Sequence, residues 1–252
     1  MRWGRNLILV LIGIIGWFGS SGAAEKIPFR PGEKLHFRVY WSGIQAGEAT
    51  LEVMPMEAFN DAPAYHFLMV VKTFPFVDLF YKVRDRIESY TDVDMSHALL
   101  YKEKKEGKRK KDVFITYDWE KLLVQYSEDG KKRKPVTLLP GAFDPLSVFY
   151  FFRMHELKEN LEIVTPVSDG KDCVIGKATV VKKEKVKVAS GEYETYLVEP
   201  AMEQIGGVFQ KSSGAKLQIW VTADERRLPV KIKSKVVVGS FSAELDSVET
   251  PQ

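Results

Sequence analysis

The sequence has a single cysteine, Cys173, and only four histidines in 252 residues. One thiol cannot form an intramolecular disulfide, so the fold has to be stabilised by its core. His36, His66, His97 and His155 are scattered and show none of the paired spacings of zinc helices or zinc fingers. We therefore expect no metal site and no cofactor, and we expect Cys173 to be a buried, unreactive thiol.

The motifs of common catalytic and nucleotide-binding sites are also lacking. The chain contains no GxSxG elbow, no P-loop and no GxGxxG turn. Carboxylates are abundant, with 34 Asp and Glu residues, but most of them lie beside lysines on strand faces that we expect to be wet. Catalytic carboxylates can come from distant strands, so an enzyme is not excluded. No pattern indicates one, however, and we predict no catalytic residue.

Long apolar runs are absent except at the N-terminus. Arg2 and Arg5 precede an apolar run from Leu7 to Phe18, and small residues follow it up to Ala24. This arrangement predicts a secretory signal peptide, residues 1–24, that is cleaved after Ala24. The alternative is an uncleaved membrane anchor, but the run is shorter than the roughly 20 residues that span a bilayer. No cysteine lies near the cleavage site, so we do not expect a lipoprotein.

Cleavage would leave residues 25–252, which we expect to form a single β-rich domain in the periplasm. Removal of Arg2 and Arg5 lowers the formal charge from +3 to +1. A nearly neutral chain attracts charged partners only through local patches.

Most of this mature region has the alternation of half-buried strands. Leu35, Phe37, Val39 and Trp41 alternate with polar or amphipathic residues, and the same period of two recurs at 216–222. Residues 65–73, rich in apolar and β-branched side chains, and residues 112–118 are also predicted to be strands. Short turns rich in Gly, Asp and Lys connect these runs. The pattern predicts antiparallel sheets with one dry and one wet face.

The segment PGAFDPLSVFYFFR, residues 140–153, interrupts this pattern. Asp144 is a good helix N-cap and Pro145 suits the first helical position. The following helix, at about residues 145–155, is apolar on nearly every side and is therefore expected to be buried. The predicted fold is mainly β: a curved antiparallel sheet that forms an open or incomplete barrel around this one short helix.

Two further segments, residues 73–85 and 201–215, carry apolar side chains between strands. They are read as loops that either cap the core or border an apolar trough beside the helix, and Gly206-Gly207 would make the second a mobile flap. The hypothetical trough consists of Phe74, Phe76, Phe80, Phe149, Phe152, Val208 and Phe209.

Lysine and arginine gather in residues 102–111 and 131–134. In a meander, both turns are expected at the same end of the sheet, where they would attract an anionic envelope surface. The alternative is that they only solubilise hairpin tips. No aromatic platform lies among them, so nucleic acid is not an expected partner. The hypothetical patch consists of Lys104, Lys105, Lys108, Arg109, Lys110, Lys131, Lys132 and Arg133.

Four segments together resemble the domain-of-unknown-function family 3108 of exported bacterial proteins. They are GEKLHFRVYWSGIQAGEATLEV, VRDRIESYTD, DPLSVFYFFR and IWVTADERRLPVKIKSK, and the last carries Trp220, Asp224, Arg227 and Pro229. The resemblance extends from about Phe29 to Glu249. It implies a periplasmic protein of a Gram-negative bacterium and no catalytic residues. The sheet around a helix is also similar to the half-barrels of periplasmic lipoprotein carriers, a likeness of fold alone.

Three hypotheses for function follow. The first is a non-enzymatic periplasmic protein that binds or carries a lipid, a lipoprotein acyl chain or another hydrophobic ligand in the trough. The second is an interaction or scaffold protein of the envelope with a fully packed core. The third is an enzyme, such as a hydrolase, whose site is assembled from distant strands.

Overall fold

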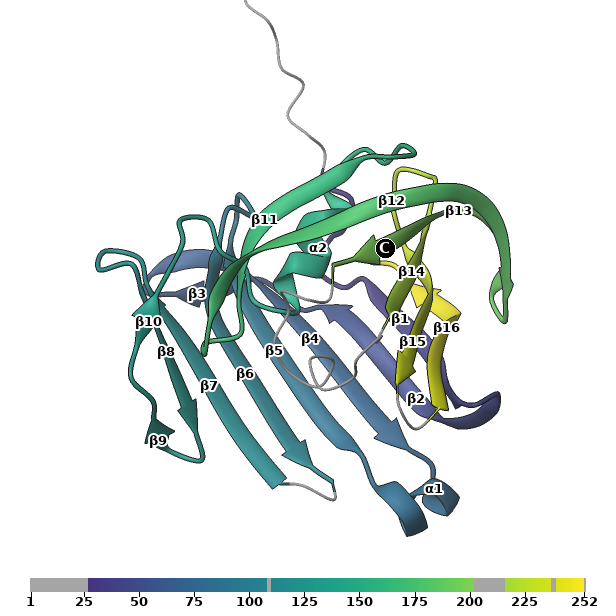
Figure 1. Cartoon of the computed structure of the whole chain (residues 1–252), viewed down its shortest axis with the longest axis horizontal. Coiled ribbons are helices and arrows are strands. Elements are labelled where there is room, and N and C mark those ends of the chain that lie inside the picture. The colour runs from purple at the N-terminus through teal and green to yellow at the C-terminus, as the bar shows by residue number, and fades with distance from the viewer. Residues whose placement is uncertain (1–26, 108–109, 202–215, 237–238, 252) are drawn as a thin grey trace, which may run out of the picture.

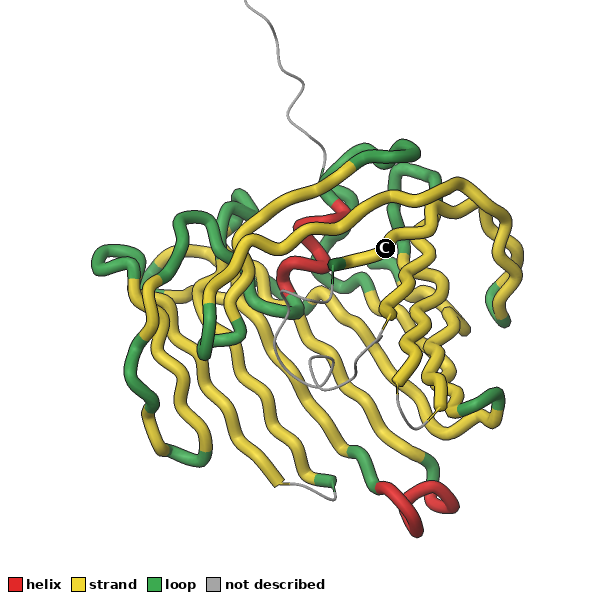
Figure 2. Tube along the Cα trace, viewed as in Figure 1, coloured by secondary structure: helices red, strands yellow, loops and turns green. Residues whose placement is uncertain are grey.

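The computed structural model describes residues 27–107, 110–201, 216–236 and 239–251, and in these residues β-strands predominate (Figures 1 and 2). The N-terminal half contains β1 (Lys34–Trp41), β2 (Ile44–Val53), β3 (Glu57–Phe59), β4 (Ala62–Thr73), β5 (Arg84–Asp92), β6 (Ala98–Glu106), β7 (Lys110–Asp118), β8 (Leu123–Glu128), β9 (Lys131–Lys132) and β10 (Val136–Thr137). The C-terminal half contains β11 (Glu162–Ser168), β12 (Cys173–Val188), β13 (Gly191–Pro200), β14 (Lys216–Thr222), β15 (Pro229–Val236) and β16 (Gly239–Glu249). The described helices are α1 (Pro75–Tyr81) and α2 (Ser147–Arg153).

All of these strands belong to one antiparallel sheet. Its order is β10-β8-β7-β6-β5-β4-β2-β1-β16-β15-β14-β13-β12-β11, with β3 beside β4 and β9 beside β8. Among the described strands, the ladder between β1 and β16 is the only one that joins the two halves of the chain. In the described part of the chain, no ladder connects the end strands β10 and β11, so the barrel stays open. The predicted fold, a curved antiparallel sheet in an incomplete barrel, is confirmed.

Residues on one face of the sheet, here called the inner face, form the main core with α2. Across five neighbouring strands the register aligns Val53, Phe67, Ser89, Tyr101 and Ile115. All five are buried. The Tyr150 ring of α2 stacks on the Phe67 ring at 3.8 Å between centroids, so the helix packs directly on this row. The opposite, outer face carries the alternating polar residues, as an antiparallel sheet allows.

Helix α2 is buried as expected, but the predicted bounds were wrong by two residues at each end. The Asp144 carboxylate accepts hydrogen bonds from the backbone N–H groups of Leu146 and Ser147, so it does cap the first turn. The regular helix nevertheless begins only at Ser147, after the turn at Pro145. At the other end Met154 N–H bonds back three residues to the Phe151 carbonyl, which tightens the last turn and ends the helix at Arg153.

A second helix lies where the sequence was read as a loop. Helix α1 occupies most of the segment between β4 and β5, with Pro75 in its first turn, where the missing N–H group costs nothing. In Figure 1, α1 lies at the lower end of the sheet and α2 at the upper end. The description of a sheet around one helix was therefore incomplete.

Arg153, the last residue of α2, is the largest fully buried side chain of the described residues. Its two terminal nitrogens donate to the two Glu33 oxygens at 2.6 and 3.1 Å, and Nη2 also donates to the Arg226 carbonyl at 2.9 Å. The guanidinium lies over the rings of Phe29 and Tyr150, 5.4 and 5.7 Å from their centroids. This bidentate pair fixes α2 to the chain just before β1.

We expect Arg153→Met to lower the free energy of unfolding by about 3–5 kcal/mol, because Glu33 would be left as a buried, unpaired charge. Urea unfolding followed by circular dichroism measures this. The double variant Glu33→Gln/Arg153→Met should recover part of the loss. Arg226→Met is the matched control, since the Arg226 guanidinium is exposed and its ion pair among the described residues is with Asp224. Equal destabilisation by the two single variants would refute an anchoring role for Arg153.

Candidate functional site

Below the row that packs on α2, the inner face divides into an apolar half and a charged half. The next row aligns Leu51, Met69 and Ile87, and the row after that aligns Ala49 with Val71. Leu51 is buried, whereas the other four are only partly buried. Ala49, Met69 and Ile87 pack against the margin of the core, as does Phe149 of α2. We call Ala49, Leu51, Met69, Val71, Ile87 and Phe149 the apolar strip.

The same two rows continue with charged side chains on β5, β6, β7 and β8, although the buried Val113 of β7 lies between Glu103 and Glu128 in the first row. Asp85 lies opposite Lys105, and Lys105 lies opposite Lys111. Lys105 Nζ is 2.8 Å from Glu103 and 3.8 Å from Asp85, and Lys111 Nζ is 3.7 Å from Glu103. Glu128 on β8 completes this ionic cluster at 4.0 Å from Lys111 Nζ. The inner face thus places an apolar strip directly beside a half-buried group of ions.

Burial and neighbouring charges act in opposite senses within the ionic cluster. Burial raises the pKa of the Asp85 carboxyl above its ordinary value, although Lys105 works against the shift. Burial works to lower the pKa of Lys105, but Glu103 and Asp85 outweigh it and hold that pKa above its ordinary value. Lys105 therefore stays charged at neutral pH and holds the carboxylates of two adjacent strands together.

The structure places the residues of the hypothetical trough at different points. Phe152 packs into a second core cluster with Leu157, Ile163, Val180, Val198 and Val221. Phe149 borders the main core, while Phe74 and the exposed Phe76 and Phe80 belong to the α1 segment at the other end of the sheet (Figure 1). Val208 and Phe209, like Gly206-Gly207, lie outside the described residues. The described aromatic residues of this set therefore do not line one trough.

The two basic tips do project from the same end of the sheet. Glu106 pairs with Lys110 at the end of the β6–β7 hairpin, and Glu128 pairs with Val113 on β7 and with Lys131 on β9. Lys104 Nζ is 2.7 Å from Glu106, and Arg133 is 3.9 Å from Glu128. Lys131 and Lys132 are exposed. Lys108 and Arg109 lie outside the described residues.

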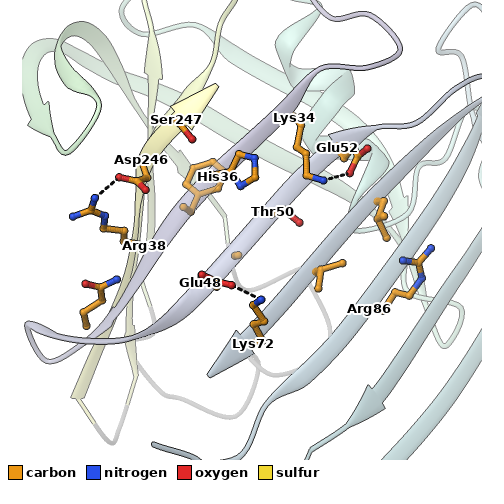
Figure 3. A pocket seen from close by; sticks show the side chains of 15 residues that line it. Lys34, His36, Arg38, Glu48, Thr50, Glu52, Lys72, Arg86, Asp246 and Ser247 are labelled. Atoms are coloured by element: carbon orange, nitrogen blue, oxygen red, sulfur yellow. Dashed lines mark ion pairs between the residues drawn. The ribbon is translucent and has the colours of Figure 1, made fainter. Parts of the chain in front are cut away.

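The outer face carries a hollow of about 720 Å³ on β1, β2, β4, β5 and β16 (Figure 3). The charged side chains around it are paired: Lys34 with Glu52 at 3.0 Å, Arg38 with Asp246 at 2.6 Å, and Lys72 with Glu48. Because these charges neutralise one another across neighbouring strands, the hollow favours neither an anion nor an apolar ligand.

A cluster around His66 was not visible in the sequence, because its members come from three strands. The buried His66 ring lies 2.8 Å from Glu57 of β3 and 3.1 Å from Glu88 of β5, and it stacks on Tyr90. None of these residues lines the hollow of Figure 3. Within the described ranges, no three His, Cys, Asp or Glu side chains are grouped closely enough to hold a metal ion. We assign His66 a structural role between these strands.

The Asp144 carboxyl is fully buried beside α2, and its ionisation should change the free energy of unfolding. Burial raises the pKa of its carboxyl, while hydrogen bonds from Ser89, Ser147 and the backbone oppose the rise. Because the pKa of Asp144 is higher in the folded than in the unfolded protein, its protonated form favours the folded state. This contribution to stability is complete below the unfolded pKa of about 4 and is lost as the pH rises through the folded pKa. The stability difference between wild type and Asp144→Asn should therefore shrink as the pH rises above about 4.

Urea unfolding at a series of pH values measures this difference. Asp224→Asn is the control of opposite sign: burial works to raise the pKa of Asp224, but Thr222 and Arg226 outweigh it and leave that pKa lowered. The advantage of wild type over Asp224→Asn should accordingly grow as the pH rises. A pH-independent difference for Asp144→Asn would show that burial does not shift this carboxyl.

Fold and site together define an open, curved β half-barrel with a fixed helix at one end. No described helix has the length and hydropathy needed to cross a bilayer. The chain belongs to the family described as "Protein of unknown function (DUF3108)", whose model matches residues 36–246.

Among solved structures, the chain is similar to a β-barrel-like protein of the domain of unknown function DUF1849 from Brucella abortus. The TM-score is 0.59 at 10% identity, and the match covers 89% of this chain and 99% of that one. A protein from Bacteroides fragilis with a YmcC-like fold matches at a TM-score of 0.37 and 8% identity, over 89% of this chain and 98% of the other. No curated protein matches the sequence significantly. At 10% identity the match to the Brucella abortus protein establishes a similar fold and nothing more.

Proposed function

We propose that this chain is a non-enzymatic protein of the periplasm that binds an amphiphilic lipid, such as a phospholipid or the acyl chain of a lipoprotein, on its inner face. The observation that carries the proposal is the division of this face into the apolar strip and the adjacent ionic cluster. An acyl chain fits along Met69, Ile87 and Phe149, because apolar contact removes these side chains from water. The headgroup then lies near Lys105 and Lys111, whose ammonium groups donate to its oxygens.

In this proposal α2 is a fixed end wall and does not move aside. Its two ends are held by fully buried polar groups, Asp144 at the start and Arg153 at the finish. Withdrawing the helix would expose its aromatic side chains to water and leave Glu33 without its partner, which is costly. Ligand entry is therefore expected along the open inner face, from the end of the sheet that lies away from α2.

A second candidate is an interaction protein of the envelope that carries no ligand. The close packing of Tyr150 on Phe67 and the burial of Phe152 favour it, since both make α2 a permanent part of the core. The apolar strip is then the margin of that core. The two candidates differ in whether lipid accompanies the protein.

Gentle purification, followed by organic extraction and mass spectrometry, tests the proposal. We expect a lipid at a constant ratio to protein. Met69→Arg should lower the bound amount more than tenfold, because it puts a charge into the acyl site. Val70→Arg is the matched control, since the next residue of β4 faces the outer side. Circular dichroism verifies that both variants fold. Wild-type protein that repeatedly comes out empty would refute ligand binding and favour the second candidate.

The periplasmic location rests on residues 1–24, which lie outside the described residues. We expect signal peptidase to cleave after Ala24, so that the exported chain begins at Glu25. N-terminal sequencing of protein released by osmotic shock measures the start. A chain that still carries residues 1–24 and sediments with membranes would support the uncleaved anchor instead.

A further inference from the structure

Exposed apolar side chains gather at one end of the sheet. Seven of the thirteen exposed large hydrophobic residues of the described chain lie there: Trp41, Ile44, Phe76, Leu79, Phe80, Tyr81 and Phe241. Leu79 and Phe80 of α1 are the most exposed of all, at 82% and 74%. Large groups of exposed apolar side chains are typical of the sites where folded proteins bind partners or membranes.

The ladder registers show that these residues lie at the same end of neighbouring strands. Trp41 pairs with Ile44 and with Phe241, and Gly47 pairs with Thr73 just before α1. Lys72 pairs with Arg84 after α1, and the β6–β7 and β8–β9 tips follow along the same end. We call this end of the sheet, with its turns and α1, the lower rim. It comprises residues 40–45, 73–85, 105–107, 110–111, 128–133, 235 and 240–241. In Figure 1 the lower rim is the lower end of the sheet, where α1 projects furthest.

The exposure of α1 is built into the fold. The Asp78 carboxylate receives two hydrogen bonds from the Arg84 guanidinium, at 2.6 and 3.2 Å, and a third from the Thr73 hydroxyl. Phe74 N–H donates to the Ala46 carbonyl of β2 at 2.9 Å, which ties the start of α1 to the neighbouring strand. Val77 is the one buried residue of the helix. This clamp holds Phe76, Leu79 and Phe80 outward in fixed positions.

Cations surround this apolar surface. The lower rim carries nine of them against five carboxylates. The cations are Lys82, Arg84, Lys105, Lys110, Lys111, Lys131, Lys132, Arg133 and Lys235, and the carboxylates are Asp78, Asp85, Glu106, Glu128 and Asp129. The exposed Lys82, Lys131 and Lys132 make no ion pair with any described residue. Aromatic and aliphatic side chains flanked by lysines suit the boundary between acyl chains and anionic headgroups.

From this combination we infer that the lower rim is a docking surface for an anionic phospholipid bilayer. Leu79, Phe80 and Ile44 enter the headgroup region, and the lysines of the hairpin tips bind lipid phosphates. Charge complementarity favours a bilayer over a second copy of this chain, because two lower rims would bring like charges together. The inference does not depend on the proposed ligand. It would also bring the open end of the inner face next to the membrane.

Flotation of the purified protein with vesicles tests the inference. We expect binding to vesicles of phosphatidylglycerol and phosphatidylcholine, weak binding to phosphatidylcholine alone, and release in about 1 M salt, where the screening length is about 3 Å. Leu79→Ser/Phe80→Ser should weaken binding at least tenfold, and Lys131→Glu/Lys132→Glu by a similar factor. Because these side chains are exposed, the variants should keep the wild-type unfolding curve.

Matched controls come from exposed residues away from the lower rim. Two double variants should bind vesicles like wild type. They are Val164→Ser/Ile175→Ser, on β11 and β12, and Lys185→Glu/Lys187→Glu, on β12. Met69→Arg should also dock normally, which separates this inference from the proposed ligand site. Absent binding to anionic vesicles, or undiminished binding by the α1 variant, would overturn it. A dimer that Leu79→Ser/Phe80→Ser converts to monomer, without vesicle binding, would show a self-association surface instead.

Discussion

The buried ion pair between Arg153 and Glu33 is the interaction on which the architecture depends. A curved sheet that does not close needs something to fill its concave side, and α2 does so with its aromatic side chains, of which Tyr150 stacks on Phe67. Without a partner the cation at the end of such a helix would be expelled from the core. Glu33 removes that penalty and ties α2 to the chain just before β1. One interaction thus both completes the core and positions the two halves of the sheet.

The two ends of the half-barrel have opposite characters because their connections differ. At the upper end, α2 packs its aromatic side chains into the core, and the buried Asp144 carboxylate accepts hydrogen bonds from Ser89, Ser147 and the backbone. At the lower end, α1 is clamped so that apolar side chains face water, and lysines occupy the hairpin tips. Between them the inner face changes from core to apolar strip and ionic cluster. The two ends of the sheet therefore differ: α2 fills the upper end, whereas the lower end exposes apolar side chains and lysines to solvent.

Local patterns were enough to predict the strands and the buried helix, because alternation at Leu35 or Phe37 and the all-apolar face around Phe149 are properties of short segments. Strand β11 is harder to predict because it contains Pro166, although Ile163 and Val167 keep the alternation and a strand at the end of a sheet tolerates proline. Helix α1 was missed because its clamp joins Asp78 to Arg84, on the next strand. The ionic cluster depends on the registers of β5, β6 and β7, including a bulge at Tyr90, and sequence alone does not define registers across separate hairpins.

The pairing of β1 with β16 has a consequence for how this protein acquires its structure. Lys34 and Glu249 are partners although they lie more than 200 positions apart in the chain, whereas β4 to β8 form a meander of local hairpins. Closing so long a loop is entropically costly. We therefore expect the local hairpins to form first and the ladder between β1 and β16 to form last. Until nearly the whole polypeptide has emerged, both half-sheets expose apolar faces and unpaired edges. Folding speed and aggregation should therefore be governed by the chain's final strand.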